Sequence, residues 1–310
     1  MSGRSRRRRL RLIDAVSIKW PAPAKLNLFL HICGRREDGY HELQTLFQLI
    51  DLHDELVIEP RNDGLVHRAF GPVDVPAEQD LVVRAGRLLQ SVAGIDKGAN
   101  ITLHKQVPTG AGLGGGSSDA ATTLLVLNQM WGCNYSLDRL AQLGLELGAD
   151  VPLFVRGHTA FAVGVGEDLK PVELGERHYL LVMMPMHIST AELFQHAALQ
   201  RDCPKISQAK ALAGEGFNAF EPLVRQLYPG MAQALDQLQQ FGTPRMTGTG
   251  SSIFLEMADA DAATKATIQL KSLYNVRAVR GQDQSPVHQM LQEVSWNGHG
   301  WQSAGTSPSW

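Results

Sequence analysis

A run of glycines between an expected strand and an expected helix constrains this chain more than any other feature. The segment 108–119 reads Pro-Thr-Gly-Ala-Gly-Leu-Gly-Gly-Gly-Ser-Ser-Asp. Residues 100–106 alternate as a strand before it, and residues 117–131 have the pattern of a helix ended by Gly132. Glycines allow positive φ angles and a close backbone approach to a ligand, and a helix start offers unpaired N–H groups. The segment therefore predicts a binding site for phosphate groups.

Three interpretations of the glycine run compete. A Walker P-loop is excluded because no lysine follows the glycines. A dinucleotide-binding fingerprint matches Gly110 to Gly115, but the acidic residue at a suitable spacing, Asp138, lies at a helix start rather than at a strand end. A loop without a ligand would carry the entropic cost of its glycines for no gain, so phosphate binding is favoured.

The expected nucleotide-binding residues are those of the loop, the two serines that open the helix, and a lysine at the end of the preceding strand. They are Pro108, Thr109, Gly110, Ala111, Gly112, Leu113, Gly114, Gly115, Gly116, Ser117, Ser118 and Lys105. For the lysine, an exposed position on the strand is the competing interpretation.

Hydrophobic periodicity elsewhere indicates a mixture of strands and helices without strict alternation, which favours the α+β class. Further strands are expected at 25–32, 46–58 with a polar turn at 51–54, 179–184, 252–257 and 276–279. Further helices are expected at 80–92, 136–148, 231–240 and 259–273. Asp80 and Ser136 are expected to cap two of these helices. A boundary near residues 160–180 would divide the chain into two domains of ordinary size.

Composition narrows the class of protein further. The chain is 44% hydrophobic and 19% charged, with a net charge of −2, so a globular protein is expected and neither nucleic acid nor a membrane is an expected partner. No apolar stretch is long enough to span a bilayer, and no secretory signal follows the first arginines. Cys33, Cys133 and Cys203 lie far apart, which indicates neither a disulfide framework nor a zinc site and favours the cytoplasm.

The two ends of the chain differ from the rest. Residues 1–16 are rich in arginine, and 293–310 mix small polar residues with tryptophan. Both are expected to be disordered tails. A targeting or nucleic-acid role is the alternative for the arginine run.

Five ordered segments resemble the motifs of the GHMP kinase superfamily. They are 21–28 (Pro-Ala-Pro-Ala-Lys-Leu-Asn-Leu), 36–45 (Arg-Glu-Asp-Gly-Tyr-His-Glu-Leu-Gln-Thr), 108–120, 147–152 (Leu-Gly-Ala-Asp-Val-Pro) and 246–252 (Met-Thr-Gly-Thr-Gly-Ser-Ser). The resemblance covers about residues 18 to 290. It implies an N-terminal domain like ribosomal protein S5 domain 2 at 17–165 and a ferredoxin-like C-terminal domain at 166–292. ATP and substrate would meet in the cleft between them.

The glycine loop and the segment 36–45 resemble those of members that act on a sugar alcohol linked to cytidine diphosphate. The implied reaction transfers the γ-phosphoryl group of ATP, with Mg²⁺, to the 2-hydroxyl of 4-diphosphocytidyl-2-C-methyl-D-erythritol, in the non-mevalonate route to isoprenoid precursors. The implied enzyme is a monomer or a homodimer. Two alternatives stay open: a superfamily kinase for homoserine, mevalonate or galactose, and a ligand sensor without catalysis.

The resemblance also implies residue roles. Asp150 would accept the proton of the substrate hydroxyl as general base, and Lys25 would be its electrostatic partner. Asn27, two residues along the same strand face, would bind the substrate or the aspartate. Tyr40 would stack on cytosine, and His41 would hydrogen-bond the polar edge of the base. For Asp150 alone, the capping of a turn is the ordinary alternative.

Further substrate-binding and structural residues follow from the later motifs. Phe194 matches a second aromatic residue that would close over the base, with a core position as the alternative, and Thr190 would contact the substrate. The third motif would pack against the phosphate loop, or else form a simple hairpin turn; its central residues are Gly248, Thr249, Gly250 and Ser251. No glutamate matches the usual magnesium ligand of the superfamily, so the metal ligands are unknown, with Ser118 as a candidate.

Overall fold

The computed structural model describes residues 18–37, 39–73 and 75–303. The predicted disorder of residues 1–16 falls outside this part of the chain. The strands are β1 (Trp20–Arg35), β2 (His41–Arg61), β3 (Val66–Phe70), β4 (Gly98–His104), β5 (Ala160–Gly164), β6 (Asp168–Pro171), β7 (His178–Met183), β8 (Arg245–Met246), β9 (Ser252–Met257), β10 (Asn275–Gln282), β11 (Val294–Trp296) and β12 (Trp301–Ser303).

The helices lie between these strands and are mostly short. They are α1 (Leu81–Ala93), α2 (Gly115–Trp131), α3 (Leu137–Leu147), α4 (Val151–Arg156), α5 (Thr190–Gln195), α6 (Gln208–Leu212), α7 (Glu221–Leu227), α8 (Pro229–Leu238), α9 (Ala260–Leu270) and α10 (Pro286–Glu293), with 3₁₀ turns at Ala77–Gln79 and Gln239–Phe241. The predicted caps are confirmed, because Asp80 accepts a hydrogen bond from Val82 N at the start of α1 and Ser136 accepts one from Arg139 N in α3.

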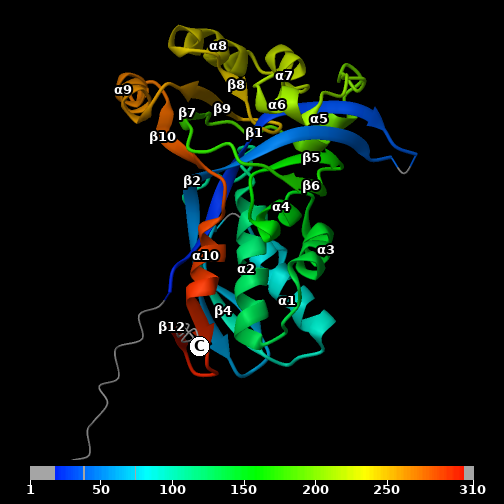
Figure 1. Ribbon diagram of the computed structural model, residues 1–310, viewed down its shortest axis with the longest axis vertical. Helices are drawn as coiled ribbons and strands as arrows, with labels where there is room; N and C mark the ends of the chain where they lie inside the picture. The colour runs from blue at the N-terminus through cyan, green and yellow to red at the C-terminus, as the bar shows by residue number, and fades with distance from the viewer. Residues whose placement is uncertain (1–17, 38, 74, 304–310) are drawn as a thin grey trace, which may run out of the picture.

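One mixed sheet runs through the molecule, and its long strands β1 and β2 extend from one half into the other (Figure 1). Its main path is β3-β4-β2-β10-β7-β9-β8, and β1 and β5 also pair with β2. β2 changes partners along its length, because residues 43–47 pair with β5 and residues 55–61 with β4. Only β3 and β4 pair in parallel among the strands that the structure describes.

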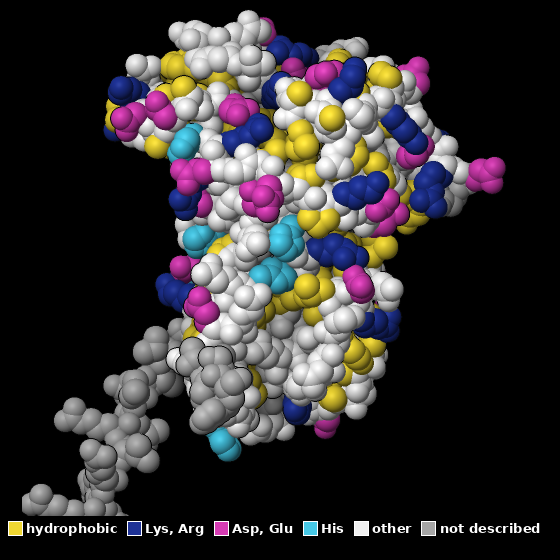
Figure 2. Space-filling model, in the orientation of Figure 1, with side chains coloured by type: hydrophobic (Ala, Val, Ile, Leu, Met, Phe, Trp, Pro, Cys, Tyr) yellow, Lys and Arg dark blue, Asp and Glu magenta, His cyan; other side chains and the backbone are white. Residues whose placement is uncertain are grey.

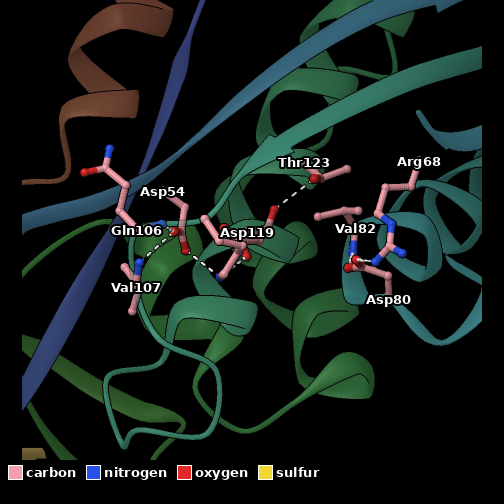
Figure 3. A network of polar contacts seen from close by, with 9 residues as sticks. Asp54, Arg68, Asp80, Val82, Gln106, Val107, Asp119 and Thr123 are labelled. Carbon is pink, nitrogen blue, oxygen red and sulfur yellow. Dashed lines mark hydrogen bonds and ion pairs between the residues drawn. The ribbon is translucent and has the colours of Figure 1, made fainter. Parts of the chain in front are cut away.

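The predicted polar turn at 51–54 is wrong, because β2 continues through it. The carboxylates of Asp51 and Asp54 accept hydrogen bonds from neighbouring segments, while their backbone remains in the strand. Asp51 accepts a hydrogen bond from Arg280 N, and Asp54 accepts two from Gln106 N and Val107 N (Figure 3). Polar side chains inside a strand pattern therefore marked contacts with neighbouring segments here, not a reversal of the chain.

Helices α1, α2, α3, α4 and α10 gather in one half of the molecule, and α5 to α9 gather in the other (Figure 1). The first half has a core of buried side chains that includes Leu56, Leu89 and Leu124. The second half has a core around Phe220 and Leu235. A third apolar cluster lies on the sheet strands that both halves share, so the two halves are joined by continuous packing.

The end of the described chain returns to the first half. Val287 of α10 is buried in the first core, and Trp301 of β12 packs edge-on against Trp20 with ring centroids 4.8 Å apart. The expectation of a disordered tail from residue 293 is therefore wrong for residues 294–303, because burial of aromatic surface offsets the cost of ordering this hairpin. The domain boundary suggested near residue 165 stays a prediction.

Charged side chains of both signs are interspersed over the face seen in Figure 2, in keeping with the net charge of −2. Within the described ranges, no helix is both long and apolar enough to cross a lipid bilayer.

Candidate active site

The glycine loop turns sharply between β4 and α2. Gly110, Gly112 and Gly114 have φ angles of +69°, +75° and +73°, which only glycine adopts readily. Helix α2 begins at Gly115, two residues earlier than predicted, and no side chain caps its first N–H groups. The 17-residue helix therefore presents its free amides and the positive end of its dipole at the loop, as an anion site requires.

A second glycine turn, formed by residues 248–251 of the third motif, packs directly against this loop. Ser252 N donates a hydrogen bond to Ala111 O, and Thr247 Oγ1 donates one to Gly112 O. A Cβ atom placed on Gly112 would lie 2.4 Å from Thr247 O and 2.8 Å from Gly250 O. The two turns thus fit together only because no side chain separates them.

Lys25 and Asp150 face one another beside the loop. The Nζ atom of Lys25 lies 3.5 Å from Oδ2 of Asp150 and donates a hydrogen bond of 2.5 Å to Oδ1 of Asn27. Lys25 is only 3% exposed, whereas the side chain of Asp150 is 34% exposed. Asp150 precedes α4, yet its carboxylate makes no capping hydrogen bond to that helix. The ordinary capping role therefore does not account for this aspartate.

Backbone contacts fix β1 against both glycine turns. Lys25 N donates a hydrogen bond to Leu113 O, and Asn27 N donates one to Thr247 Oγ1. The amide of Asn27 also donates to Thr45 Oγ1 on β2 at 3.0 Å. The lysine and the asparagine are thus held in place from three sides.

These groups line a cleft of about 550 Å³. Its walls include Gly110, Gly112, Gly114, Ser117, Lys25, Asn27, Asp150, Thr190, Phe194, Gly248 and Thr249. Thr190 of α5 and Thr249 of the second turn share a hydrogen bond between their hydroxyl groups at 2.7 Å. The structure thus brings together residues that are separated by more than 200 positions in the sequence.

A larger pocket of about 930 Å³ adjoins the cleft and shares Phe194 with it. Tyr40 and His41 line this pocket at the start of β2, together with Arg201. The ring of His41 stacks on Phe194 with centroids 4.8 Å apart and 28° between the planes, and Tyr40 is 65% exposed. The predicted base-binding residues therefore line one pocket, where the ring of His41 contacts the phenylalanine ring.

Lys105 lies apart from the cleft, at the base of the loop. Its ammonium donates to Oδ2 of Asp54 at 2.5 Å and to Oδ2 of Asp119 at 2.7 Å, and both carboxylates are almost fully buried (Figure 3). Burial alone would lower the pKa of Lys105, but the two carboxylates outweigh it and raise that pKa. Burial raises the pKa of Asp119 to about 8, against the opposing effect of Lys105.

Lys105 also borders a separate pocket of about 360 Å³ with Pro108 and Thr109, so a nucleotide base could contact its stem. The sequence reasoning missed Asp54, Asp119 and Arg201. Asp119 stood inside the recognised motif, but Arg201 carried no local signal.

Oxygen donors suited to Mg²⁺ are few around the cleft. No group of three acidic, histidine or cysteine side chains that could hold a metal occurs in the described residues. Ser117 and Asp150 line the cleft, whereas Ser118 is fully buried and its hydroxyl has no hydrogen-bond partner. Two oxygen donors beside a phosphate site fit a hard cation that draws most of its ligands from a bound triphosphate and water.

Two family models match this chain, one in each half. Residues 80–158 match the GHMP kinases N terminal domain, and residues 194–276 match the GHMP kinases C terminal domain. A protein of Nitrosococcus oceani named 4-diphosphocytidyl-2-C-methyl-D-erythritol kinase is 56% identical over 235 residues, which cover 76% of this chain and 84% of the relative. A protein of Tolumonas auensis with the same name is 47% identical and covers 90% of this chain and 98% of the relative.

Solved structures give the same result for the fold. A crystal structure of 4-(cytidine 5'-diphospho)-2C-methyl-D-erythritol kinase superposes with a TM-score of 0.76 at 36% identity, over 86% of this chain and 100% of that one. A homoserine kinase from Cytophaga hutchinsonii superposes with a TM-score of 0.64 at 17% identity, over 92% and 98% of the two chains. At that identity the second likeness concerns the fold alone. The predicted two-domain α+β fold is thereby confirmed.

Proposed function

The chain belongs to the GHMP kinase family, and we propose that it transfers the γ-phosphoryl group of ATP to the 2-hydroxyl of 4-diphosphocytidyl-2-C-methyl-D-erythritol. The observation that carries this proposal is the pairing of Lys25 and Asp150 at 3.5 Å in a cleft that adjoins the pocket of His41 and Phe194. The names of the relatives support the choice of substrate. The step would belong to the non-mevalonate route to isoprenoid precursors.

The phosphate loop would hold the triphosphate of ATP. Phosphoryl transfer depends mainly on positioning and on stabilising negative charge. The unpaired amides of α2 and the left-handed glycines before it supply fixed donors that need no reorganisation during the reaction. Packing of the second glycine turn against Gly112 would keep those donors aligned.

Asp150 would accept the proton of the attacking hydroxyl, since its carboxylate is exposed to the cleft and is not used for capping. Lys25 would orient this carboxylate and place a positive charge where negative charge develops on the transferred group. The hydrogen bond from Lys25 to Asn27 limits the ammonium to this position.

The pocket beside the cleft would bind the cytidine. Stacking of a base on an aromatic ring contributes roughly 1–3 kcal/mol. Tyr40 and Phe194 offer such rings, and the imidazole of His41, which stacks on Phe194, offers a polar edge. Thr190 would contact the substrate near the third motif.

Ser117 and Asp150 line the cleft and would hold Mg²⁺ together with the triphosphate, whose charge the cation would partly neutralise.

The test is ADP release from ATP measured with the cytidyl substrate and with homoserine, mevalonate and galactose. We expect turnover with the cytidyl substrate alone. Replacement of Asp150 by Asn should lower kcat by about 10²–10⁴-fold while cytidine binding persists. The exposed Asp168 serves as a matched control, because Asp168→Asn should leave kcat unchanged. Turnover of another alcohol in place of the cytidyl substrate, or full activity in Asp150→Asn, would refute the proposal.

A further inference from the structure

Arg201 makes an unusual set of contacts at the wall of the larger pocket. Its Nε donates to Nε2 of His41 at 3.1 Å. Its two terminal nitrogens donate to the backbone oxygens of Phe194, His196 and Leu199 at 2.8–3.0 Å. The guanidinium is thus held by three carbonyl groups while its Nε–H points at the imidazole.

This contact determines the protonation pattern of the imidazole. Arginine has N–H donors, no acceptor, and is not deprotonated in proteins. Nε2 of His41 must therefore present a lone pair, and in the neutral ring the proton lies on Nδ1. Among the described residues, none hydrogen-bonds Nδ1, so its N–H is available to a ligand in the pocket that His41 lines.

The surroundings also keep the ring neutral and immobile. Burial, and then the positive charges of Arg201 and Arg35, lower the pKa of His41. Arg36, Glu146 and Glu167 also line this pocket, but among the described residues only Arg201 and Arg35 add a charge effect to the pKa of His41. Stacking on Phe194, which itself packs edge-on against Phe220, fixes the ring plane.

We propose that Arg201 is a positioning residue that locks His41 as an Nδ1–H donor and thereby makes the pocket prefer cytosine to uracil. The proposal rests on the function proposed above. Atom N3 of cytosine is a hydrogen-bond acceptor, whereas N3 of uracil carries a hydrogen. A fixed ring N–H pairs with the first and opposes the second. A ring free to change tautomer can present a lone pair on Nδ1 and so accept the uracil N3–H.

The prediction that separates this role from simple loop support is its dependence on pH. In Arg201→Met the long side chain remains, but the obligatory donor and its charge are lost. At high pH the neutral ring of His41 can then adopt either tautomer. At low pH the protonated ring again carries a hydrogen on Nδ1, so the preference for cytosine should return.

The first measurement is the ratio of the dissociation constants of CDP and UDP, obtained by calorimetry at pH 5 and pH 8.5; the lower value is chosen because burial still lowers the pKa of His41 in the variant. The wild-type ratio should favour CDP equally at both values. In Arg201→Met we expect the preference to fall about tenfold or more at pH 8.5, which corresponds to one lost discriminating hydrogen bond, and to recover at pH 5. Arg201→Lys, which keeps an obligatory donor, should retain most of the preference.

The second measurement is independent of any ligand. Nitrogen-15 NMR of histidine-labelled protein reports the tautomer of His41 directly, and we expect the lone pair on Nε2 in the wild type and a mixture in Arg201→Met. The exposed Arg277 on β10 gives the control, since Arg277→Met should change neither readout.

Three outcomes would overturn the proposal: an unchanged preference in Arg201→Met, an equal loss at both pH values, or an unchanged tautomer. The tautomer readout also separates this inference from the proposed kinase activity. A protein that does not phosphorylate the cytidyl substrate but shows the locked tautomer would refute the activity and not the role of Arg201.

Discussion

Replacement of Lys105 by Met should destabilise the protein by an amount that grows with pH. The ammonium of Lys105 lies 2.5 Å and 2.7 Å from the buried carboxylates of Asp54 and Asp119, below the phosphate loop. Methionine has a similar length and can fill the space. The substitution therefore removes the charge and its two hydrogen bonds with little change in packing.

The size of the effect follows from the burial of both carboxylates. Removal of one partner from a buried ion pair typically costs about 3–5 kcal/mol. At pH 6 the cost should be at the lower end, because Asp119, with its pKa raised to about 8, is already protonated. Above pH 8 the wild-type Asp119 is ionised opposite Lys105, whereas in the variant it has no counterion.

Proton linkage determines whether the free energy of unfolding rises or falls with pH. The pKa of Asp119 is raised on folding, from about 3.9 in an unfolded chain, so the folded wild type holds an extra proton up to about pH 8. Its stability falls with rising pH over that range and then levels off. Without Lys105 the folded pKa of Asp119 rises further, so the fall continues beyond pH 8, by up to about tenfold in the folding constant per pH unit.

The assay is equilibrium unfolding in urea at pH 6, 7, 8 and 9, followed by tryptophan fluorescence. Trp20, Trp131 and Trp301 all lie in or against the first core, so their emission reports the half that contains Lys105. Asp119→Asn is the matched control: it removes the titrating group, so its stability should vary little between pH 6 and 9. A destabilisation by Lys105→Met that stays constant across this range would refute the reasoning.

Two further predictions concern packing. Gly112→Ala should lower stability by several kcal/mol and abolish ATP binding, because its Cβ would meet the second glycine turn at 2.4 Å; Gly116→Ala, whose Cβ would lie 3.6 Å from its nearest neighbour among the described residues, should leave stability unchanged or slightly higher. Urea unfolding of both variants and nucleotide titration of Gly112→Ala check this, and equal losses of stability would contradict it. Trp301→Ala should lower the free energy of unfolding by about 3 kcal/mol, the lower end of the range for a buried tryptophan, because Trp301 is only half-buried; kcat should not change, since Trp301 packs on Trp20 and neither lines the cleft. Calorimetry and the ADP-release assay measure the two quantities, and a large loss of kcat would argue against a purely structural role.

Local features of the fold were readable from the sequence because their causes are local. The caps of α1 and α3 depend on one residue next to the helix, Asp80 or Ser136, and the phosphate loop depends on a short run of glycines. The hairpin of residues 294–303 was missed because its stability comes from a tryptophan at the other end of the chain. Polar and small residues made that segment look unstructured when it was considered alone.

The residues of the candidate site also fall into two groups, those that the sequence located and those that it did not. The resemblance located Lys25 and Asp150, and the structure places them in contact. The partners that tune the site lie far away in sequence: Asp54 is 51 residues from Lys105, and Arg201 is 160 residues from His41. An aspartate in an apolar-rich stretch is first read as part of a turn, and an arginine in a loop is common, so no local pattern distinguishes these residues before the chain is folded.

The arrangement of β1 shows why periodicity alone could not define the active site. Alternation places Lys25 and Asn27 on one strand face, but it does not say which partners their backbone N–H groups find on the side of β1 away from β2. Irregularities in the β1–β2 pairing lie beside both residues, and their N–H groups donate to Leu113 O and to Thr247 Oγ1. Bulges often redirect a strand beside an active site. In this protein one strand contacts both glycine turns, which couples the position of Lys25 to the loop proposed to hold the phosphates.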